Sequence, residues 1–392
     1  MAACLAYTIY NDFSLIEPEW KELQESGACY VFQTFEWCTC WYNTMGRRNG
    51  VKPCLVSVRA DTKIIMIVPL GIWAESGITW LRFIAPRISD YRCALLSRDF
   101  AAVVQGQGFH DVWENIVRLL PRVDIIELTH MPADIDGTAN PFLQLNRVTQ
   151  SNVAHSAKLP STFEEFTANR RAHFFRDTRR KRRRLAEAGN IGFQVHHGST
   201  LNAVMDVLAL QKGRRWMASA GESFFDTCAG LLDFYKTLGG LSFDGGCGHV
   251  SSLAVDGRIV ATHLGLVFKD RFYSLLPAYA AGAWTRYSPG RTLMENLVRN
   301  CISDGMKTFD LTVGDEPYKR DWADNSLALY EHRRGLTWRG SAFLAVLAAK
   351  RKLRGALKQI GRLRKFVARV RSARWSKKVA GREDAVELNL DA

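Results

Sequence analysis

Hydrophobic and polar positions alternate along the first 150 residues in a pattern that mixes strands with helices. The β-branched runs Cys54–Arg59 and Ile64–Leu70 flank a short polar segment, and this spacing predicts a hairpin. The other elements expected here are helices at Glu19–Glu25, Thr34–Met45 and Phe109–Leu120, strands at Thr79–Ala85, Tyr91–Leu96 and Val123–Leu128, and a turn-rich loop at Asp134–Asn140.

The second half of the chain repeats this rhythm of strands and helices. We expect helices at Thr162–Ala188, Leu201–Ala218 and Thr292–Ser303, and strands at Ile191–His196, Val250–Val255, Ile259–Phe268, Arg271–Tyr279, Thr308–Thr312 and Leu327–Arg333. The sequence therefore predicts a mixed α/β (α+β) fold built from a duplicated module. The expected domains are residues 1–150, residues 151–340 and a basic helical tail at 341–392.

Positive charge is concentrated in two segments. The formal net charge is +14, and residues 339–378 hold fourteen Lys and Arg with no Asp or Glu. Residues 170–184 add nine Lys and Arg against one Asp, so the remainder of the chain is mildly acidic. In the tail, an apolar stripe accompanies the positive charge (Leu353, Leu357, Ile360, Leu363, Val367 and Val370). An amphipathic basic helix of this kind fits an anionic membrane surface, or docks on its own domain or a partner.

Composition excludes several classes of protein. Apolar residues make up 47% of the 392 residues, which is the globular range, and no apolar run approaches the length of a membrane span. The N-terminus lacks the basic and apolar regions of a secretory signal. Nine scattered cysteines favour free thiols in a reducing compartment, and no spacing of Cys and His predicts a metal site. We therefore expect a cytoplasmic protein without a metal.

A candidate anion site lies at the start of the helix near residue 290. Pro289 and Gly290 place a tight turn directly before the helix, and the amides at a helix start suit a pyrophosphate. Arg291 adds a positive charge beside them. An ordinary connection between a strand and a helix is the alternative.

A second candidate site follows the strand that contains Asp310. Asp315, Glu316, Tyr318 and Lys319 come within nine residues of it, in a loop that begins at a glycine. Carboxylates at such a strand end can accept a proton from an attacking amine or hydroxyl, and a tyrosine can protonate a departing thiolate. The alternative is a solvated polar loop anchored by a tryptophan.

The order of these parts resembles a known family, the CelD-like acetyltransferases (named for a cellulose-biosynthesis protein) of the GNAT superfamily, which are related to the FemAB transferases. The resemblance covers roughly residues 5–335. The matching segments are residues 32–37, 89–91, 170–185, 257–265, 271–273, 277–279, 287–291, 309–312 and 314–319 with Trp322.

This resemblance implies two tandem GNAT-like halves with mixed central sheets, followed by the basic tail. It also implies an acyltransferase that moves an acetyl or other acyl group, rather than an amino-acyl group, from acyl-CoA. The acceptor would be an amine or hydroxyl of a sugar, an exopolysaccharide precursor or another small molecule. By the same resemblance, the cofactor is expected to bind at Tyr287, Ser288, Pro289, Gly290, Arg291 and Thr292. Leu264 lies in the strand expected to contact the thioester (262–266), where a backbone N–H would polarise the carbonyl.

The roles expected from the resemblance are specific. Asp315 or Glu316 removes a proton from the acceptor, Tyr318 protonates the leaving sulfur, and Asp310 is included with these catalytic residues. Lys319, His263, Asp90 and Tyr91 are expected at the substrate, although His263 is also consistent with a buried core histidine.

Two other functions stay open at this point. One is a FemAB-like transfer from aminoacyl-tRNA to a cell-wall precursor, and the other is a non-catalytic module that binds RNA or a membrane. No nucleophile elbow, P-loop or dinucleotide-binding glycine motif is present in the sequence. The Arg-rich segment 170–184 fits a solvated helix face, an acidic or phosphorylated substrate, or, less favoured, nucleic acid. Docking of residues 341–378 would place the protein on the inner face of the membrane.

Overall fold

One mixed sheet of fourteen strands organises the chain, in a computed structural model that describes residues 4–106, 108–168 and 170–359. The first half contains α1 (Glu17–Ser26), α2 (Phe35–Trp41), α3 (Phe100–Val104), α4 (Phe109–Leu119), β1 (Leu5–Tyr10), β2 (Lys52–Ala60), β3 (Lys63–Glu75), β4 (Ile78–Phe83), β5 (Leu95–Leu96), β6 (Ile125–Pro132), β7 (Asp134–Ile135), β8 (Thr138–Ala139) and β9 (Thr149–Lys158).

The rest contains α5 (Phe163–Ala168), α6 (Ala172–Ala186), α7 (Ser199–Ala220), α8 (Phe224–Thr227), α9 (Leu231–Gly239), α10 (Pro289–Ser303), α11 (Lys319–Trp322), α12 (Trp338–Gln359), β10 (Ile191–His196), β11 (Ser242–Phe243), β12 (Gly246–Val255), β13 (Arg258–Phe268), β14 (Arg271–Tyr279), β15 (Thr308–Val313) and β16 (Asn325–Gly335). A mixed α/β fold was expected, and the structure confirms it.

The two halves repeat one topology. In the first, antiparallel β2, β3 and β4 lead through α4 to β6, which pairs parallel to β4. In the second, antiparallel β12, β13 and β14 lead through α10 to β15, which pairs parallel to β14. This repeat confirms the duplication expected from the sequence.

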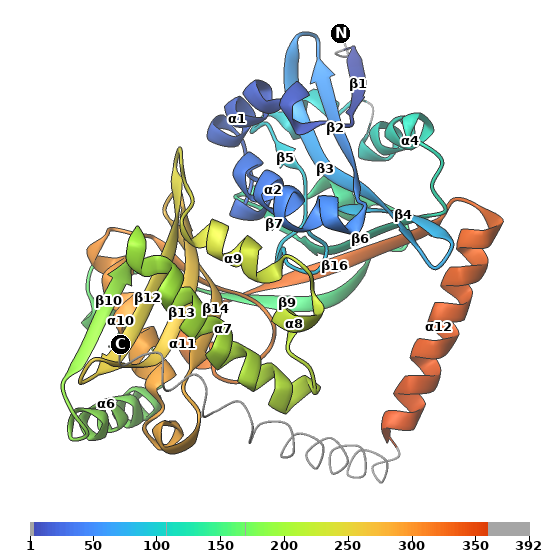
Figure 1. Cartoon of the computed structure of the whole chain (residues 1–392). Helices are drawn as coiled ribbons and strands as arrows, with labels where there is room; N and C mark the ends of the chain where they lie inside the picture. The colour runs from blue at the N-terminus through green and yellow to red at the C-terminus, as the bar shows by residue number, and fades with distance from the viewer. Residues whose placement is uncertain (1–3, 107, 169, 360–392) are drawn as a thin grey trace.

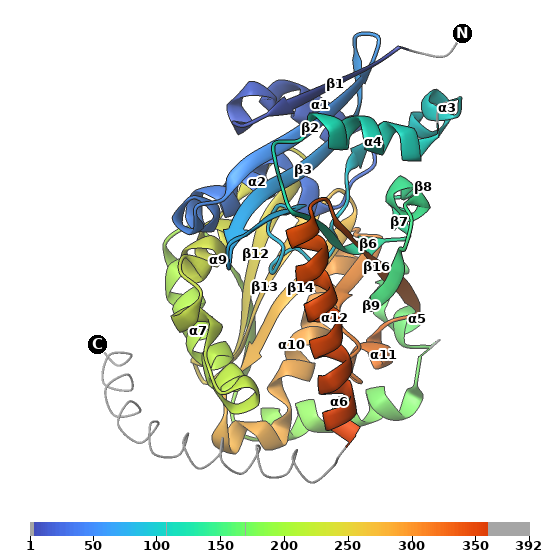
Figure 2. The same ribbon diagram turned by 90° about the vertical axis from the view of Figure 1, so that its right-hand side faces the viewer.

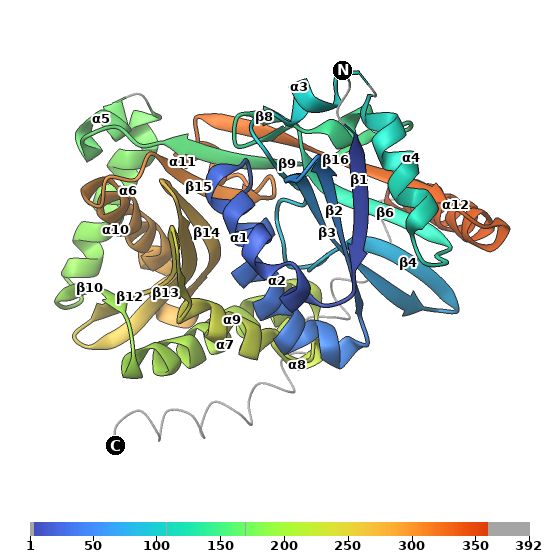
Figure 3. The same cartoon turned by 90° about the horizontal axis from the view of Figure 1, so that it is seen from above.

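The halves exchange one strand each. β9 ends the first half of the chain but pairs with β15 of the second, and β16 lies late in the second half but pairs with β6 of the first. β9 and β16 also pair with each other, so the sheet is continuous, and both strands run between the halves (Figures 1 and 3). Because each half supplies a strand to the other, their relative position is fixed by backbone hydrogen bonds.

Several sequence predictions fail in instructive ways. The strand expected at Tyr91–Leu96 is reduced to β5, and β1 and β9 were not expected. The single helix expected over Thr162–Ala188 is two helices, α5 and α6. Arg170 occupies the break, where its guanidinium contacts the Phe166 ring at 3.6 Å and donates to the Trp322 carbonyl at 2.9 Å. These contacts hold Arg170 outside both helices, between the end of α5 and the start of α6.

The first part of α12 packs beside β4 and β16, and the helix then extends away from the rest of the body (Figure 1). Phe343, Leu344 and Leu347 contact the main core, and the Phe343 ring meets the Trp80 ring edge-on at 5.6 Å. Of the alternatives expected for the basic tail, this part of the helix therefore packs on its own domain. Most of the expected apolar stripe, from Ile360 onward, lies outside the described residues. Within the described chain, no helix has the length and apolarity needed to cross a membrane.

Candidate functional site

Strands β14 and β15 separate partway along their length. Their parallel pairing covers only three positions, from Arg271↔Thr308 to Tyr273↔Asp310. Beyond these positions β14 stays paired with β13, and β15 stays paired with β9. Across the described residues no strand fills the space between their facing edges, and such edges offer N–H and C=O groups to an extended ligand. We call this opening the splay.

Asp310 holds the closed end of the splay. Its carboxylate is fully buried and accepts hydrogen bonds from the Tyr91 hydroxyl at 2.7 Å, Arg271 Nη1 at 2.9 Å and the Thr312 amide at 2.8 Å. A buried carboxylate with three donors is engaged within the protein and is shielded from a substrate. The expected catalytic role of Asp310 and substrate contact of Tyr91 are therefore corrected: both residues join the two halves.

Asp90 is the carboxylate closest in character to a general base. It is half-buried in the first half of the chain, and burial raises its pKa to about 6. A hydrogen bond from the Thr312 side chain and the positive charges of Lys319 and Arg92 oppose this rise. Asp90 therefore lies beside the first residues of β15 that leave the pairing with β14, and it titrates near neutral pH.

The acidic loop after β15 divides between two sides of that strand. Asp315 turns toward β9, where its carboxylate meets His155 Nε2 at 3.0 Å and forms an ion pair with Arg320. The hydrogen bond from Arg320 is the main cause that holds the pKa of Asp315 below its usual value. The structure thus places this expected base in a surface ion pair beside a cavity lined by His155 and Ser326.

The other three residues of the loop group together. Lys319 is buried, and its ammonium donates to the carbonyls of Val313 at 2.6 Å and Thr312 at 3.4 Å while it pairs with Glu316 at 3.2 Å. Its donors are thus engaged, so Lys319 positions the end of β15 instead of binding an acceptor. Burial and the charge of Glu316 raise the pKa of Tyr318 to about 12, which keeps its hydroxyl protonated.

Helix α7 contributes two cations that the sequence did not single out. Lys212 Nζ donates to the Pro277 carbonyl on β14 at 3.1 Å, and burial lowers its pKa to about 8. Arg215 is exposed, with its guanidinium 5.3 Å from the centre of the Tyr279 ring, and its charge acts on Tyr318. The sequence offered one signal for such residues: polar side chains at helix positions that continue the apolar stripe facing the sheet.

The start of α10 lies beside the same tyrosine ring. A Cβ atom added at Gly290 would be 3.3 Å from Tyr279 Cδ1. The Tyr279 ring thus lies between the turn at Gly290 and Arg215, and both Tyr279 and Tyr318 pack against the hydrophobic cluster that contains α10. Within the described chain, the Gly290 amide has no hydrogen-bond partner.

The neighbours of Gly290 have other tasks. Arg291 pairs with Asp177 of α6 at 2.8 Å and lies over the Phe174 ring, so its charge faces α6 and not the turn. The amides of Ser288 and Arg291 already donate to backbone carbonyls. Pro289 and Thr292 are buried, and Ser288 takes a left-handed conformation with φ of 54°. Of the expected cofactor-binding stretch, the Gly290 amide and the Tyr287 ring stay accessible.

His263 and Leu264 lie in the core, contrary to their expected contact with ligand. The His263 ring is fully buried, stacks on Phe272 and is 2.8 Å from the Ser274 hydroxyl, and burial holds its pKa well below the usual value. Leu264 is fully buried in β13, which is paired on both edges. The backbone N–H groups of β13 are therefore not free to polarise a thioester carbonyl, and the unpaired edge of β14 offers the candidate N–H groups instead.

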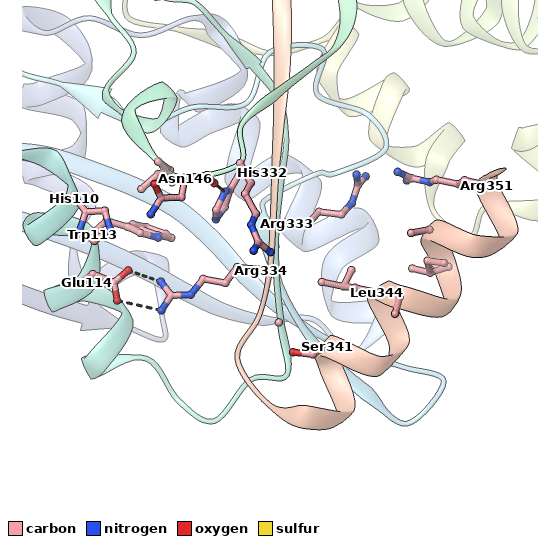
Figure 4. A pocket seen from close by; sticks show the side chains of 16 residues that line it. His110, Trp113, Glu114, Asn146, His332, Arg333, Arg334, Ser341, Leu344 and Arg351 are labelled. Carbon is pink, nitrogen blue, oxygen red and sulfur yellow. Dashed lines mark hydrogen bonds and ion pairs between the residues drawn. The ribbon is translucent and has the colours of Figure 1, made fainter. Parts of the chain in front are cut away.

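A larger cavity, of about 980 Å³, lies elsewhere, between α4, β16 and α12 (Figure 4). Three of the arginines that line it pair with protein carboxylates: Arg334 with Glu114, Arg333 with Glu127 and Glu331, and Arg351 with Glu331. No cluster of His, Cys, Asp and Glu suited to a metal occurs among the residues that the structure describes.

Comparisons with known proteins agree with this geometry. Residues 172–320 match the family model described as the acetyltransferase (GNAT) domain. A conserved protein of unknown function from Bacteroides thetaiotaomicron VPI-5482 has a similar fold, with a TM-score of 0.53 and 10% identity over 83% of this chain and 99% of that chain. FemX also has a TM-score of 0.53, with 10% identity over 82% of this chain and 96% of that chain. No curated protein matches the sequence significantly. Residues 172–320 are thus similar to a GNAT-type acetyltransferase domain, and the chain shares the fold of these two solved structures.

Proposed function

We propose that this protein transfers an acyl group from an acyl-CoA thioester to an amine or hydroxyl of a small acceptor at the junction of its two halves. The observation that carries this proposal is the splay between β14 and β15, which opens beside Asp90, Tyr318 and the turn at Gly290. The matched GNAT domain contains the splay, Tyr318 and Gly290.

The donor would lie along the free edge of β14. Residues 274–279 offer backbone groups to the amides of an extended pantetheine arm, in the manner of an added strand. Pro277 is the exception, because it has no N–H and its carbonyl accepts a hydrogen bond from Lys212. The bulge opposite Leu264 and Gly265 inserts Leu275 into this edge, and a bulge of this kind re-aims the neighbouring N–H groups. One such N–H would polarise the thioester carbonyl.

The diphosphate would lie at the start of α10. The Gly290 amide and the positive end of a 15-residue helix attract an anion, and Arg215 supplies a cation next to Tyr279. Arg215 thus takes the part that the sequence predicted for Arg291.

Proton transfer would use Asp90 and Tyr318. The acceptor attacks the thioester carbonyl, so that a C–N or C–O bond forms and the C–S bond breaks. Asp90 takes the proton of the acceptor, and Tyr318 gives its proton to the departing thiolate. We prefer Asp90 to Glu316 as this base, because the Glu316 carboxylate is paired with the buried side chain of Lys319. Positioning of two substrates between the halves supplies much of the remaining rate enhancement.

We further propose a class of acceptor and a cellular location for the protein. The resemblance to CelD-like transferases supports a sugar or an exopolysaccharide precursor as the acceptor, and a cytoplasmic site of action. The exposed Lys350, Arg351 and Lys352 of α12 support docking of residues 341–378 on an anionic membrane surface. An aminoacyl-tRNA donor is the alternative that the same fold leaves open.

Calorimetric titration with acetyl-CoA tests the donor. We expect one saturable site in the wild-type chain. Gly290→Val should weaken binding at least tenfold, because a branched side chain there meets the Tyr279 ring and covers the amide. Gly192→Val is the matched control, since a Cβ at Gly192 meets nothing within 4 Å. An unchanged affinity in Gly290→Val, or no binding by the wild type, would contradict the proposal.

A further inference from the structure

The basic helix α6 lies directly against the loop that leads into α10 (Figure 2). Lys181 Nζ donates to the Arg286 carbonyl at 2.8 Å, and Asp177 pairs with Arg291 at 2.8 Å. Arg182 pairs with Glu295 of α10 at 2.9 Å. These contacts join two segments that the sequence analysis singled out. The Arg-rich run and the turn near residue 290 therefore form one surface.

A pocket of about 310 Å³ opens in this surface, lined by Arg184, Glu187, Ala188, Arg286 and Tyr287. Arg184 is exposed one helical turn beyond Lys181, on the face that meets the loop. The Arg286 guanidinium lies 4.7 Å from the centre of the Tyr287 ring and donates to the Tyr287 hydroxyl at 2.8 Å. The pocket thus combines two guanidinium groups with an aromatic ring and a single carboxylate.

These groups fit a nucleoside phosphate. Guanidinium groups bind a phosphate through paired, charge-assisted hydrogen bonds, and a phosphomonoester carries nearly two negative charges at neutral pH. A tyrosine ring offers a stacking face to a purine base. The carboxylate of Glu187 can accept a hydrogen bond from an exocyclic amino group. Each component of the pocket therefore has a counterpart in a phosphorylated adenosine.

The position of the pocket points to the same ligand. Tyr287 is three residues from Gly290, so the pocket begins where the proposed diphosphate site ends. The part of CoA that follows the diphosphate, on the side away from the thioester, is an adenosine with a 3′-phosphate. A donor laid from the splay across Gly290 would bring this end to α6.

We propose that Arg184 and Arg286 bind the 3′-phosphate of the acyl-CoA donor while Tyr287 supports its adenine ring. This inference rests on the proposed function and adds to it a specificity for the phosphorylated nucleotide. It assigns part of the Arg-rich helix to donor recognition by defined side chains. A general attraction of the whole helix for polyanions is the competing explanation.

Paired titrations with CoA and 3′-dephospho-CoA on the full chain test this assignment. The wild type should bind CoA about tenfold more tightly than 3′-dephospho-CoA, the scale of one charge-assisted contact. Arg184→Ala and Arg286→Ala should each reduce this ratio, and the double variant should bring it close to one. The affinity for 3′-dephospho-CoA should stay within about twofold in all three, because these arginines do not touch the diphosphate.

Arg179→Ala is the matched control. Arg179 is exposed on the same helix and does not line the pocket, so its removal should leave the ratio unchanged. An equal loss in Arg179→Ala, accompanied by salt-sensitive retention of an RNA oligonucleotide, would overturn the assignment in favour of general charge attraction. Equal binding of both ligands by the wild type would overturn it and leave the proposed function intact. Binding of neither ligand would overturn both.

Discussion

The Tyr91 hydroxyl donates a 2.7 Å hydrogen bond to the buried carboxylate of Asp310, across 219 residues of sequence. Tyr91 belongs to the first half of the chain, and Asp310 lies in β15 of the second half. Asp90, the residue before Tyr91, is thereby brought to the edge of the splay. The contact between Tyr91 and Asp310 thus assembles a site to which each half contributes a part.

Tyr91→Phe should lower stability. Removal of the hydroxyl leaves the buried Asp310 carboxylate with one donor fewer, which costs about 1–3 kcal/mol in the free energy of unfolding. Denaturant unfolding monitored by tryptophan fluorescence measures this change. Tyr7→Phe is the control, since the Tyr7 hydroxyl makes only a long, half-buried contact of 3.3 Å with Asn115. Equal unfolding midpoints for wild type and Tyr91→Phe would show that the contact contributes nothing.

Asp90→Asn should make stability less dependent on pH. The pKa of Asp90 is about 6 in the folded state against 3.8 for the ordinary side chain, so the folded state retains a proton that the unfolded state loses. The wild type therefore loses stability as the pH rises from 3.8 through about 6. The asparagine side chain cannot ionise, so the variant lacks this pH-dependent loss of stability. Its stability relative to wild type should therefore increase over that interval and level off above it. Denaturant titrations at pH 4.5, 6 and 7.5 provide the comparison, and a difference constant with pH would refute the assignment.

Tyr318→Phe should slow turnover by roughly 100- to 10,000-fold, the usual contribution of a positioned acid. The defect should shrink with an aryl thioester donor, because its thiolate leaves without protonation. Initial rates with both donors separate this chemical role from a loss of packing, which would slow both reactions alike. A turnover equal to that of the wild type would remove Tyr318 from the mechanism.

Arg215→Gln should weaken acyl-CoA binding about tenfold and leave kcat nearly unchanged. The guanidinium is exposed beside Tyr279 and is proposed to bind the diphosphate, so the substitution removes charge without disturbing the core. Arg214→Gln changes the adjacent residue, which points in another direction around α7, and should have little effect. A reduced kcat at saturating donor would instead place Arg215 at the reacting atoms.

Much of the fold could be predicted because its strands and helices follow simple periodicities. The hairpin of β2 and β3 buries the apolar residues of its pattern, and α4 buries Val112 and Ile116, although Leu119 at its end is exposed. β9 was missed because it is polar and rich in small residues, and its pairing with β15 and β16 makes it a strand. The break before α6 depends on where the Arg170 side chain packs, which no local pattern records.

The position of the candidate site in the chain stays a prediction, and the structure changes part of its chemical detail. Tyr318 and the helix that begins at the Gly290 turn pack in one hydrophobic cluster, whereas Asp315 pairs with Arg320 and Arg291 pairs with Asp177. Asp310 had the features of a catalytic carboxylate in sequence, and only its three buried donors reveal a structural role. Lys212 and Arg215 were missed because a charged residue on a helix is ordinarily a solvent-facing one.

Acceptor-dependent release of the CoA thiol from acetyl-CoA tests the central claim most directly. The measurement would compare wild type with Asp90→Asn between pH 5 and 8, against a panel of amino sugars and saccharide hydroxyls. We predict release that requires an acceptor, increases through about pH 6 in the wild type as Asp90 ionises, and is largely lost in Asp90→Asn. Release that no acceptor stimulates, or a pH profile identical in the two proteins, would contradict the account.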